Sequence, residues 1–232
     1  MRGPSHCELP DGPLNYQDII VIGKLVSAMK PVALPGRRIG NTLVKSSATH
    51  YDSISQFLHW CTAVLVLVAF IYGPGGPEQR VYSSAHEFNR QLHETLGLCV
   101  FALTVIRLLW RAVATRPEAP PGARWMVVMA TTVQWALYLL LLALPLTAIA
   151  GAWLEGHPLT LLAGAEIRPL FGMSHGVGAA FASAHKWLGD AIMWLAGFHA
   201  LAALFHHVVL KDDVLASMLP RWLPDGWTKI GR

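Results

Sequence analysis

Charged residues are scarce in this chain. Only 14% of the 232 residues are Asp, Glu, Lys or Arg, whereas a soluble domain usually carries about 25%. Hydrophobic residues make up 53% of the sequence, and the mean hydropathy is +0.42. This composition argues against a soluble globular domain and places the protein in the membrane class.

Cysteine is also rare. Cys7, Cys61 and Cys99 form neither a C-x-x-C pair nor a C-x-x-C-H motif, which excludes a disulfide framework and covalently attached c-type haem. Cys61 and Cys99 fall in apolar stretches, where we expect small core residues. The net charge of +4 does not indicate a nucleic-acid partner, because the basic residues cluster beside the apolar stretches rather than on one soluble face.

Four apolar stretches are each long enough for one membrane crossing, which takes about 20 helical residues. They cover about 54–72, 92–110, 125–154 and 185–210, with Pro- and Gly-rich connections between several of them. The sequence therefore predicts an all-α membrane protein, a bundle of four transmembrane helices within residues 51–215. A polar extension (1–50), with one short helix or strand at 19–26, precedes it. A tail (216–232) follows, and a kink is expected at Pro145.

The basic residues predict the orientation of the bundle. Four crossings place both termini on one side, and fourteen of the eighteen Lys and Arg residues lie on that side. Because cytoplasmic connections are enriched in Lys and Arg, both termini are predicted to be cytoplasmic. The connection 155–183 then lies on the outer side, where a short interfacial helix is expected.

The last apolar stretch carries three histidines on one helical face. His185, His199 and His206 follow one another at steps of 14 and 7 residues. Each side chain therefore returns to within about 40° of the previous one. His185 and His199 are about 21 Å apart along the helix axis. Ionisable side chains are costly inside a membrane, so such a set indicates a function, although polar contacts between helices are an alternative.

Two other histidines lie at matching depths. His93 begins the second stretch on the outer side, level with His185, and His59 begins the first on the cytoplasmic side, level with His199. Two histidine pairs at two depths are the arrangement that binds two haem b groups between the helices of a bundle, one outer and one inner.

Small residues follow these histidines at the i+4 position, which lies on the same helix face. Gly97 and Gly189 follow the outer histidines, and Ala63 and Ala203 follow the inner ones. A flat macrocycle needs helix surface without side chains at that point. Because small residues also mediate ordinary helix packing, the pattern indicates haem only together with the histidine depths.

Candidate reactant sites lie at both ends. His206, with Arg124 or Lys211 as a neighbour, is a candidate proton acceptor beside a quinone ring, because its ordinary pKa of about 6.5 suits proton exchange. The alternative is an interfacial histidine without a role. Arg90 and Lys186 are candidates for attracting an anionic reactant to the outer pair, or are ordinary interfacial anchors.

Three segments resemble the bacterial cytochrome b561 family over about residues 50–220. They are ISQFLHW (54–60), LHETLGL with the following VIRLLWR (92–111), and GFHALAALFHHVVLKDDVLASMLP (197–220). The resemblance implies a four-helix, di-haem b protein of the bacterial inner membrane that exchanges electrons with ubiquinone. It also implies haem ligation by His59, His93, His185 and His199. Some members are implicated in oxidising periplasmic superoxide. The long N-terminal extension and the 155–183 connection depart from the family pattern.

These expectations support one leading function and two alternatives. The leading one is an oxidoreductase that moves single electrons between a periplasmic reactant, superoxide or a protein, and membrane quinone. The first alternative is the cytochrome b subunit of a larger dehydrogenase. The second is a metal-ion transporter, which is disfavoured because transport sites usually lie near the membrane midplane in broken helices.

Overall fold

The structure is a computed structural model that describes residues 50–75, 78–114, 123–162, 164–170 and 172–220. Four long helices dominate this part of the chain: α2 (Ser53–Ile71), α4 (Glu87–Val113), α5 (Arg124–Leu154) and α6 (His175–Phe205). The short elements are α3 (Glu78–Val81), η1 (Ser84–His86), β1 (Leu159–Thr160), β2 (Glu166–Ile167), the π-helix η2 (His206–Leu210) and α7 (Val214–Met218). The element predicted at 19–26 lies outside the described residues.

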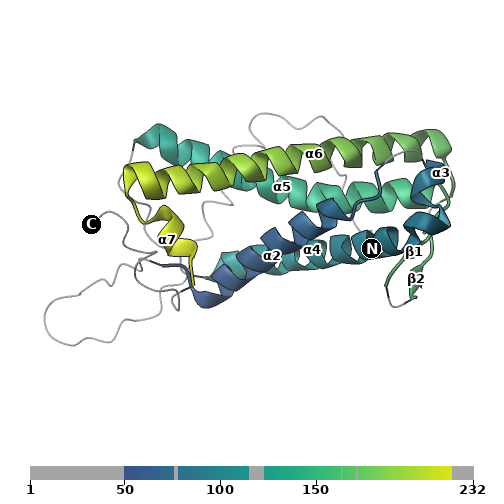
Figure 1. Ribbon diagram of the computed structural model, residues 1–232, viewed down its shortest axis with the longest axis horizontal. Coiled ribbons are helices and arrows are strands. Elements are labelled where there is room, and N and C mark those ends of the chain that lie inside the picture. The colour runs from purple at the N-terminus through teal and green to yellow at the C-terminus, as the bar shows by residue number, and fades with distance from the viewer. Residues whose placement is uncertain (1–49, 76–77, 115–122, 163, 171, 221–232) are drawn as a thin grey trace, which may run out of the picture. The chain divides into compact units, whose positions relative to one another are not determined.

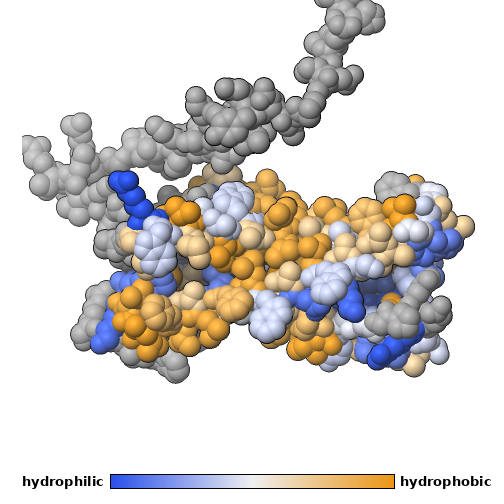
Figure 2. All heavy atoms as spheres, turned by 90° about the horizontal axis from the view of Figure 1, so that it is seen from above, coloured by the Kyte–Doolittle hydropathy of each residue, from blue (hydrophilic) through white to orange (hydrophobic). Residues whose placement is uncertain are grey.

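All four long helices are long and apolar enough to cross a membrane, which confirms the predicted helical membrane architecture. Large apolar side chains such as Phe57, Leu109 and Trp194 are exposed on the helix surfaces. Exposed apolar area of this extent is unfavourable in water and favourable against lipid. On the face shown in Figure 2, hydrophobic residues cover most of the helical surface and hydrophilic residues lie mainly toward the two ends.

The helices pack as two neighbouring pairs. Helix α5 packs along α6, α2 packs along α4, and α4 also contacts α5 (Figure 1). The start of α2 and the ends of α4 and α6 lie beside α7, and we call this the terminal end of the bundle. The strands β1 and β2 lie at the other end, which we call the hairpin end.

Helix α6 begins at His175, ahead of the predicted residue 185, and small residues let this first part approach α5 closely. A Cβ atom on Gly151 of α5 would lie only 3.1 Å from the backbone nitrogen of Ala182 of α6. Such contacts between small residues stabilise helix pairs in membranes. Further toward the terminal end, Val100, Leu141 and Ile192 join α4, α5 and α6 in one buried cluster.

The connection between α5 and α6 forms a β-hairpin in place of the expected interfacial helix. Leu159 pairs with Ile167 and Thr160 with Glu166. The hairpin is attached to α4 because the Glu94 carboxylate accepts a hydrogen bond of 2.6 Å from the backbone N–H of Thr160. A second residue of α4, Thr95, accepts through its Oγ1 from the N–H of Leu162 (3.1 Å).

Helix α7 is attached to the start of α2. The last carbonyls of a helix have no partner within the helix, and side chains of α2 and the residues before it supply donors here. The Nε2 of Gln56 donates to the Ser217 carbonyl (3.1 Å), and the Nε1 of Trp60 donates to the Met218 carbonyl (2.9 Å). The segment that follows α6 is thereby held at the terminal end.

Candidate functional site

The structure brings His93 of α4 and His185 of α6 together at the hairpin end. Their ring centres are 5.9 Å apart, and the ring planes are inclined by 89°. Two imidazoles that bind one iron from opposite sides, through bonds of about 2 Å, have ring centres about 6 Å apart. The spacing of this pair therefore suits one haem iron between the rings.

The ring of His93 is oriented by the end of α2. Its Nδ1 lies 2.7 Å from the carbonyl oxygen of Ala69, in the last turn of that helix. The helix ends at Ile71, ahead of Gly73 and Pro74, and the N–H of Gly73 bonds to the carbonyl of Phe70 rather than to that of Ala69. The Ala69 carbonyl is thus one of the last carbonyls of α2, which have no donor within the helix, and it accepts a hydrogen bond from His93 instead.

The ring of His185 is oriented by α5. Its Nδ1 lies 2.8 Å from the carbonyl oxygen of Leu144, the residue before Pro145. Helix α5 continues through this proline. The N–H that Pro145 lacks would have bonded to the Leu141 carbonyl, so the proline does not itself free the Leu144 carbonyl, which also accepts from the Oγ1 of Thr147 (2.9 Å). The sequence predicts a kink at Pro145 but not this contact.

These two contacts define the chemistry of the hairpin-end pair. A carbonyl oxygen only accepts, so the Nδ1 of each ring must carry the proton and donate it. In a neutral imidazole the Nε2 then has a lone pair available for a metal. This combination of a bonded Nδ1–H and an open Nε2 is the usual arrangement of histidine ligands.

Space for a macrocycle lies beside this pair. An added Cβ atom on Gly97 or on Gly189 would meet nothing within 4 Å. Both glycines lie one helical turn beyond a histidine of the pair, on the same face of their helices. Gly97 and Gly189 therefore leave the helix surface open where the plane of a haem would pass.

The second histidine pair, His59 of α2 and His199 of α6, lies nearer the terminal end. The ring centres are 6.4 Å apart, and the planes are inclined by 74°. This spacing also suits one iron. The surroundings differ from those of the first pair, because the Nδ1 of His59 lies 3.0 Å from a guanidinium nitrogen of Arg107 rather than from a carbonyl oxygen.

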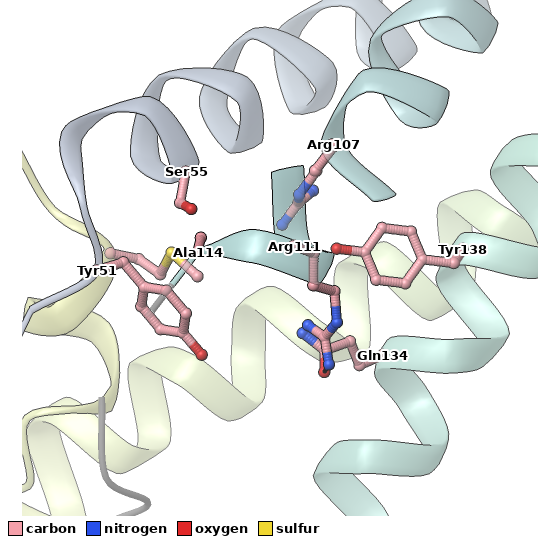
Figure 3. A pocket seen from close by; sticks show the side chains of 8 residues that line it. Tyr51, Ser55, Arg107, Arg111, Ala114, Gln134 and Tyr138 are labelled. Atoms are coloured by element: carbon pink, nitrogen blue, oxygen red, sulfur yellow. Dashed lines mark hydrogen bonds between the residues drawn. The ribbon is translucent and has the colours of Figure 1, made fainter. Parts of the chain in front are cut away.

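A small cavity lies beside Arg107, at the terminal end between α2, α4 and α5 (Figure 3). Six of the eight residues that line it have polar side chains: Tyr51, Ser55, Arg107, Arg111, Gln134 and Tyr138, with Ala114 and Met218. Both guanidinium groups lie over the ring of Tyr138, at 5.4 and 5.7 Å from its centre. The sequence does not predict that two arginines meet an aromatic ring and a cavity beside His59, because it shows Arg107 only as a basic residue near the end of the second apolar stretch.

His206 forms a pair with Asp212, again at the terminal end. The Nδ1 of His206 lies 2.5 Å from the Asp212 carboxylate. The π-helix η2 ends at Leu210, and the following residue, Lys211, has a left-handed backbone (φ 56°). The chain turns back at this residue, and the N–H of Asp212 bonds to the His206 carbonyl. This turn brings the two side chains together. Arg124, exposed at the start of α5, makes no contact with His206 within the described part of the chain.

The two cations near the hairpin end, Arg90 and Lys186, differ in exposure. Arg90 is mostly buried and bonds to the Glu94 carboxylate (3.1 Å) and to Thr160, so its charge is largely compensated. Lys186 is exposed on α6, next to His185 in the sequence. Of the two, Lys186 is the one positioned to attract an anion in solution.

The ring spacing of both pairs fits a haem iron. Each ring pair offers two imidazoles about 6 Å apart, and open space lies beside the hairpin-end pair. No group of three or more His, Cys, Asp or Glu side chains that would hold a bare metal ion occurs among residues 50–220 as far as the structure describes them. The arrangement favours two-imidazole ligation over a multidentate metal site.

Comparison with known proteins gives consistent matches. The family model described as prokaryotic cytochrome b561 matches residues 50–221. The chain is 31% identical to "Cytochrome b561 homolog 2" of Escherichia coli, over 73% of this chain and 90% of that protein. It is 30% identical to "Probable superoxide oxidase CybB" of Yersinia pestis, over 74% and 96% of the two chains. It is 33% identical to "Cytochrome b562" of Cereibacter sphaeroides, over 73% and 94%.

Proposed function

The chain belongs to the prokaryotic cytochrome b561 family, a family of membrane b-type cytochromes of electron transfer, and we propose that it moves single electrons between a periplasmic reactant and membrane quinone. The observation that carries this proposal is the presence of two imidazole pairs, with ring centres 5.9 and 6.4 Å apart, at two levels of one apolar bundle. A haem bound at such a pair supplies reversible one-electron chemistry.

The four histidines divide into two ligand pairs. His93 and His185 would hold one haem b, and His59 and His199 would hold the other. His185 and His199 belong to the same helix, and 14 residues of α-helix separate them by about 21 Å. Two groups at these levels bring both membrane surfaces within reach of an electron, which one group cannot do.

The orientation follows from the basic residues. In the sequence, fourteen of the eighteen Lys and Arg residues precede the first span, connect the second to the third or follow the fourth, so the terminal end would face the cytoplasm and the hairpin end the periplasm. The pair His93/His185 would then be the outer one. Quinone would react near the inner pair, at the terminal end.

Superoxide is the periplasmic reactant that we favour. A relative covered over 96% of its length is named a probable superoxide oxidase, and exposed Lys186 beside the outer pair would attract an anion. Two superoxide anions would each give up one electron and leave as dioxygen. One quinone would take the two electrons and two protons from the cytoplasmic side and become quinol.

His206 and Asp212 would supply those protons. The Asp212 carboxylate, 2.5 Å from the Nδ1 of His206, would orient the ring so that its Nε2 faces a proton acceptor. The pair lies one heptad beyond His199, on the side where the inner haem would exchange electrons with quinone. Arg124 remains a candidate for contact with the quinone from the start of α5.

The deciding experiment is haem quantification on the purified protein. We expect two haems b per chain by the pyridine haemochrome method, and one in His185→Ala and in His59→Ala. His175→Ala is the matched control, because His175 also lies on α6 but is largely exposed and outside both pairs. Two haems in all three variants, or none in the wild type, would refute the ligand assignment.

Reduction assays then separate the reactants. Superoxide should reduce the haems, added ubiquinone should reoxidise them, and His206→Ala should slow only the second step. Haems that respond to quinol but not to superoxide, together with co-purification of a second subunit, would favour the dehydrogenase subunit instead. A colourless protein that binds zinc would favour the transporter.

A further inference from the structure

The small cavity at the terminal end holds two positive charges. Arg107 and Arg111 are one turn apart on α4, and both of their side chains line this cavity (Figure 3). Both guanidinium groups lie over the ring of Tyr138, and Nη2 of Arg111 donates to Oε1 of Gln134 (3.0 Å). No acidic residue lines the cavity in the part of the chain that the structure describes. An anion bound beside two like charges would be stabilised by both.

The cavity lies at the level where the spanning helices begin and end. Ser55 is in the first turn of α2, Arg111 is in the last turn of α4, and Ala114 follows that helix directly. The ends of membrane-spanning helices lie at the depth of the lipid headgroups. Seven of the eight lining residues are partly exposed, so the cavity is open to its surroundings. The anion that is present at this depth in a membrane is the phosphate of a lipid.

We propose that this cavity binds the headgroup of an anionic phospholipid, whose phosphate oxygens accept hydrogen bonds from Arg107 and Arg111. Guanidinium groups present paired donors that match phosphate oxygens. Basic pockets between membrane helices on the cytoplasmic side are a known type of site for such headgroups. A zwitterionic headgroup such as that of phosphatidylcholine would bring a second cation toward the two arginines, so the site discriminates against it.

The lipid phosphate would also change the hydrogen bonding of Arg107. In the structure Nη2 of Arg107 lies 3.0 Å from Nδ1 of His59. A neutral His59 that offers Nε2 to an iron carries its proton on Nδ1 and cannot accept from a guanidinium. Haem ligation by His59 therefore requires another acceptor for Arg107, and a phosphate in the adjoining cavity supplies one. This consequence rests on the proposed haem ligation, whereas the lipid site itself does not.

Lipid binding by the purified, haem-containing protein tests the site, with native mass spectrometry as the measurement. The protein is delipidated in detergent and offered phosphatidylglycerol or phosphatidylcholine. We expect the wild type to prefer phosphatidylglycerol by about tenfold, and the double variant Arg107→Gln/Arg111→Gln to lose this preference. Arg124→Gln is the matched control, because it removes an exposed cation at the start of α5 that does not line the cavity. Equal binding of both lipids by the wild type, or an unchanged preference in the double variant, would overturn the proposal.

Ala114→Leu keeps the experiment decisive if the double variant does not fold. It leaves both charges in place and narrows the cavity, and Ala114 has an extended backbone that leucine also adopts. The variant should melt like the wild type by circular dichroism and bind phosphatidylglycerol about tenfold more weakly. A folded Ala114→Leu that binds this lipid as tightly as the wild type would contradict the site.

Inorganic phosphate distinguishes the two sources of the anion. A lipid is held by its acyl chains as well as by its phosphate, so millimolar phosphate should not displace phosphatidylglycerol. Displacement would indicate a site for free phosphate and would contradict the lipid assignment. The pyridine haemochrome, measured on the same samples, separates this result from the proposed function. Lipid binding with fewer than two haems would support the site and refute the ligation, and two haems without a lipid preference would do the reverse.

Discussion

Gly189→Leu on α6 is the sharpest test of where the outer haem would lie. In the structure an added Cβ atom at this position meets nothing within 4 Å, so it would not clash with any protein atom. Leucine is also the better helix former, by up to about 0.8 kcal/mol relative to glycine. On protein contacts alone, the variant should fold as well as the wild type or slightly better.

A bound haem would add a steric conflict that the protein atoms alone do not create. Gly189 lies one turn, about 6 Å, beyond His185 on the same helix face, where the macrocycle would pass. Four additional carbon atoms in a filled space typically cost about 1–3 kcal/mol, and 3 kcal/mol is about a hundredfold in affinity. We expect the haem content to fall from two per chain toward one, while thermal stability of the helical signal stays at or above that of the wild type.

Gly197→Leu is the matched control for this experiment. Gly197 also lies on α6 with nothing within 4 Å of an added Cβ, but it is about 160° around the helix from His199. The control should keep two haems. The assay is the pyridine haemochrome, read beside a circular dichroism melt in the same detergent. Two haems and an unaltered spectrum in Gly189→Leu would refute the reasoning, because the open space at Gly189 would then not be occupied by the macrocycle.

Two further predictions concern the two ends of the bundle. Glu94 and Arg90 are 12% and 13% exposed, and breaking a buried pair costs about 3–5 kcal/mol. Glu94→Leu should therefore lower the melting temperature more than the double variant Arg90→Met/Glu94→Leu, and a double variant that is no more stable would contradict this. At the start of α2, burial would raise the pKa of Asp52, but hydrogen bonds from Ser55 and Trp110 outweigh it and hold this pKa below its ordinary value. Because the folded pKa is lowered, the stabilisation is present above the unfolded pKa of about 3.9 and is lost as the pH falls through the folded pKa. Asp52→Ala should cost about 1 kcal/mol at neutral pH and progressively less below about pH 4, as measured by thermal melts; a cost that does not change with pH would argue against this N-cap.

The pairing of the histidines was predictable because it depends only on regular geometry. Helical rise fixes the depth of each residue along its span, and alternating crossings fix which ends share a membrane face. His93 therefore had to be level with His185, and His59 with His199, before any contact was known. The ring distances of 5.9 and 6.4 Å agree with that pairing.

Contacts that depend on where the chain turns were not predictable in the same way. The connection 155–183 forms a hairpin, attached to α4 through the Thr160 N–H and the Glu94 carboxylate. The sequence shows Glu94 only as an unfavourable charge near a span end. Its acceptor role depends on a loop that returns from 66 residues away in the sequence. Likewise, Arg107 lies on α4 and His59 on α2, and only the packing of these two helices shows which side chains meet.

The helix-breaking residues show most clearly how local signals acquire a function from tertiary structure. Gly73 with Pro74 reads as the end of a helix, and Pro145 reads as a disturbance within one. Both readings are local and both describe backbone hydrogen bonds that a helix does not make. In the bundle, the Ala69 carbonyl beside the first break is the acceptor that fixes the tautomer of His93. The Leu144 carbonyl does the same for His185, although the donor that Pro145 lacks would have bonded to Leu141. The end of α2 at Ile71 thus orients a histidine of α4 through a carbonyl that its own helix leaves without a donor.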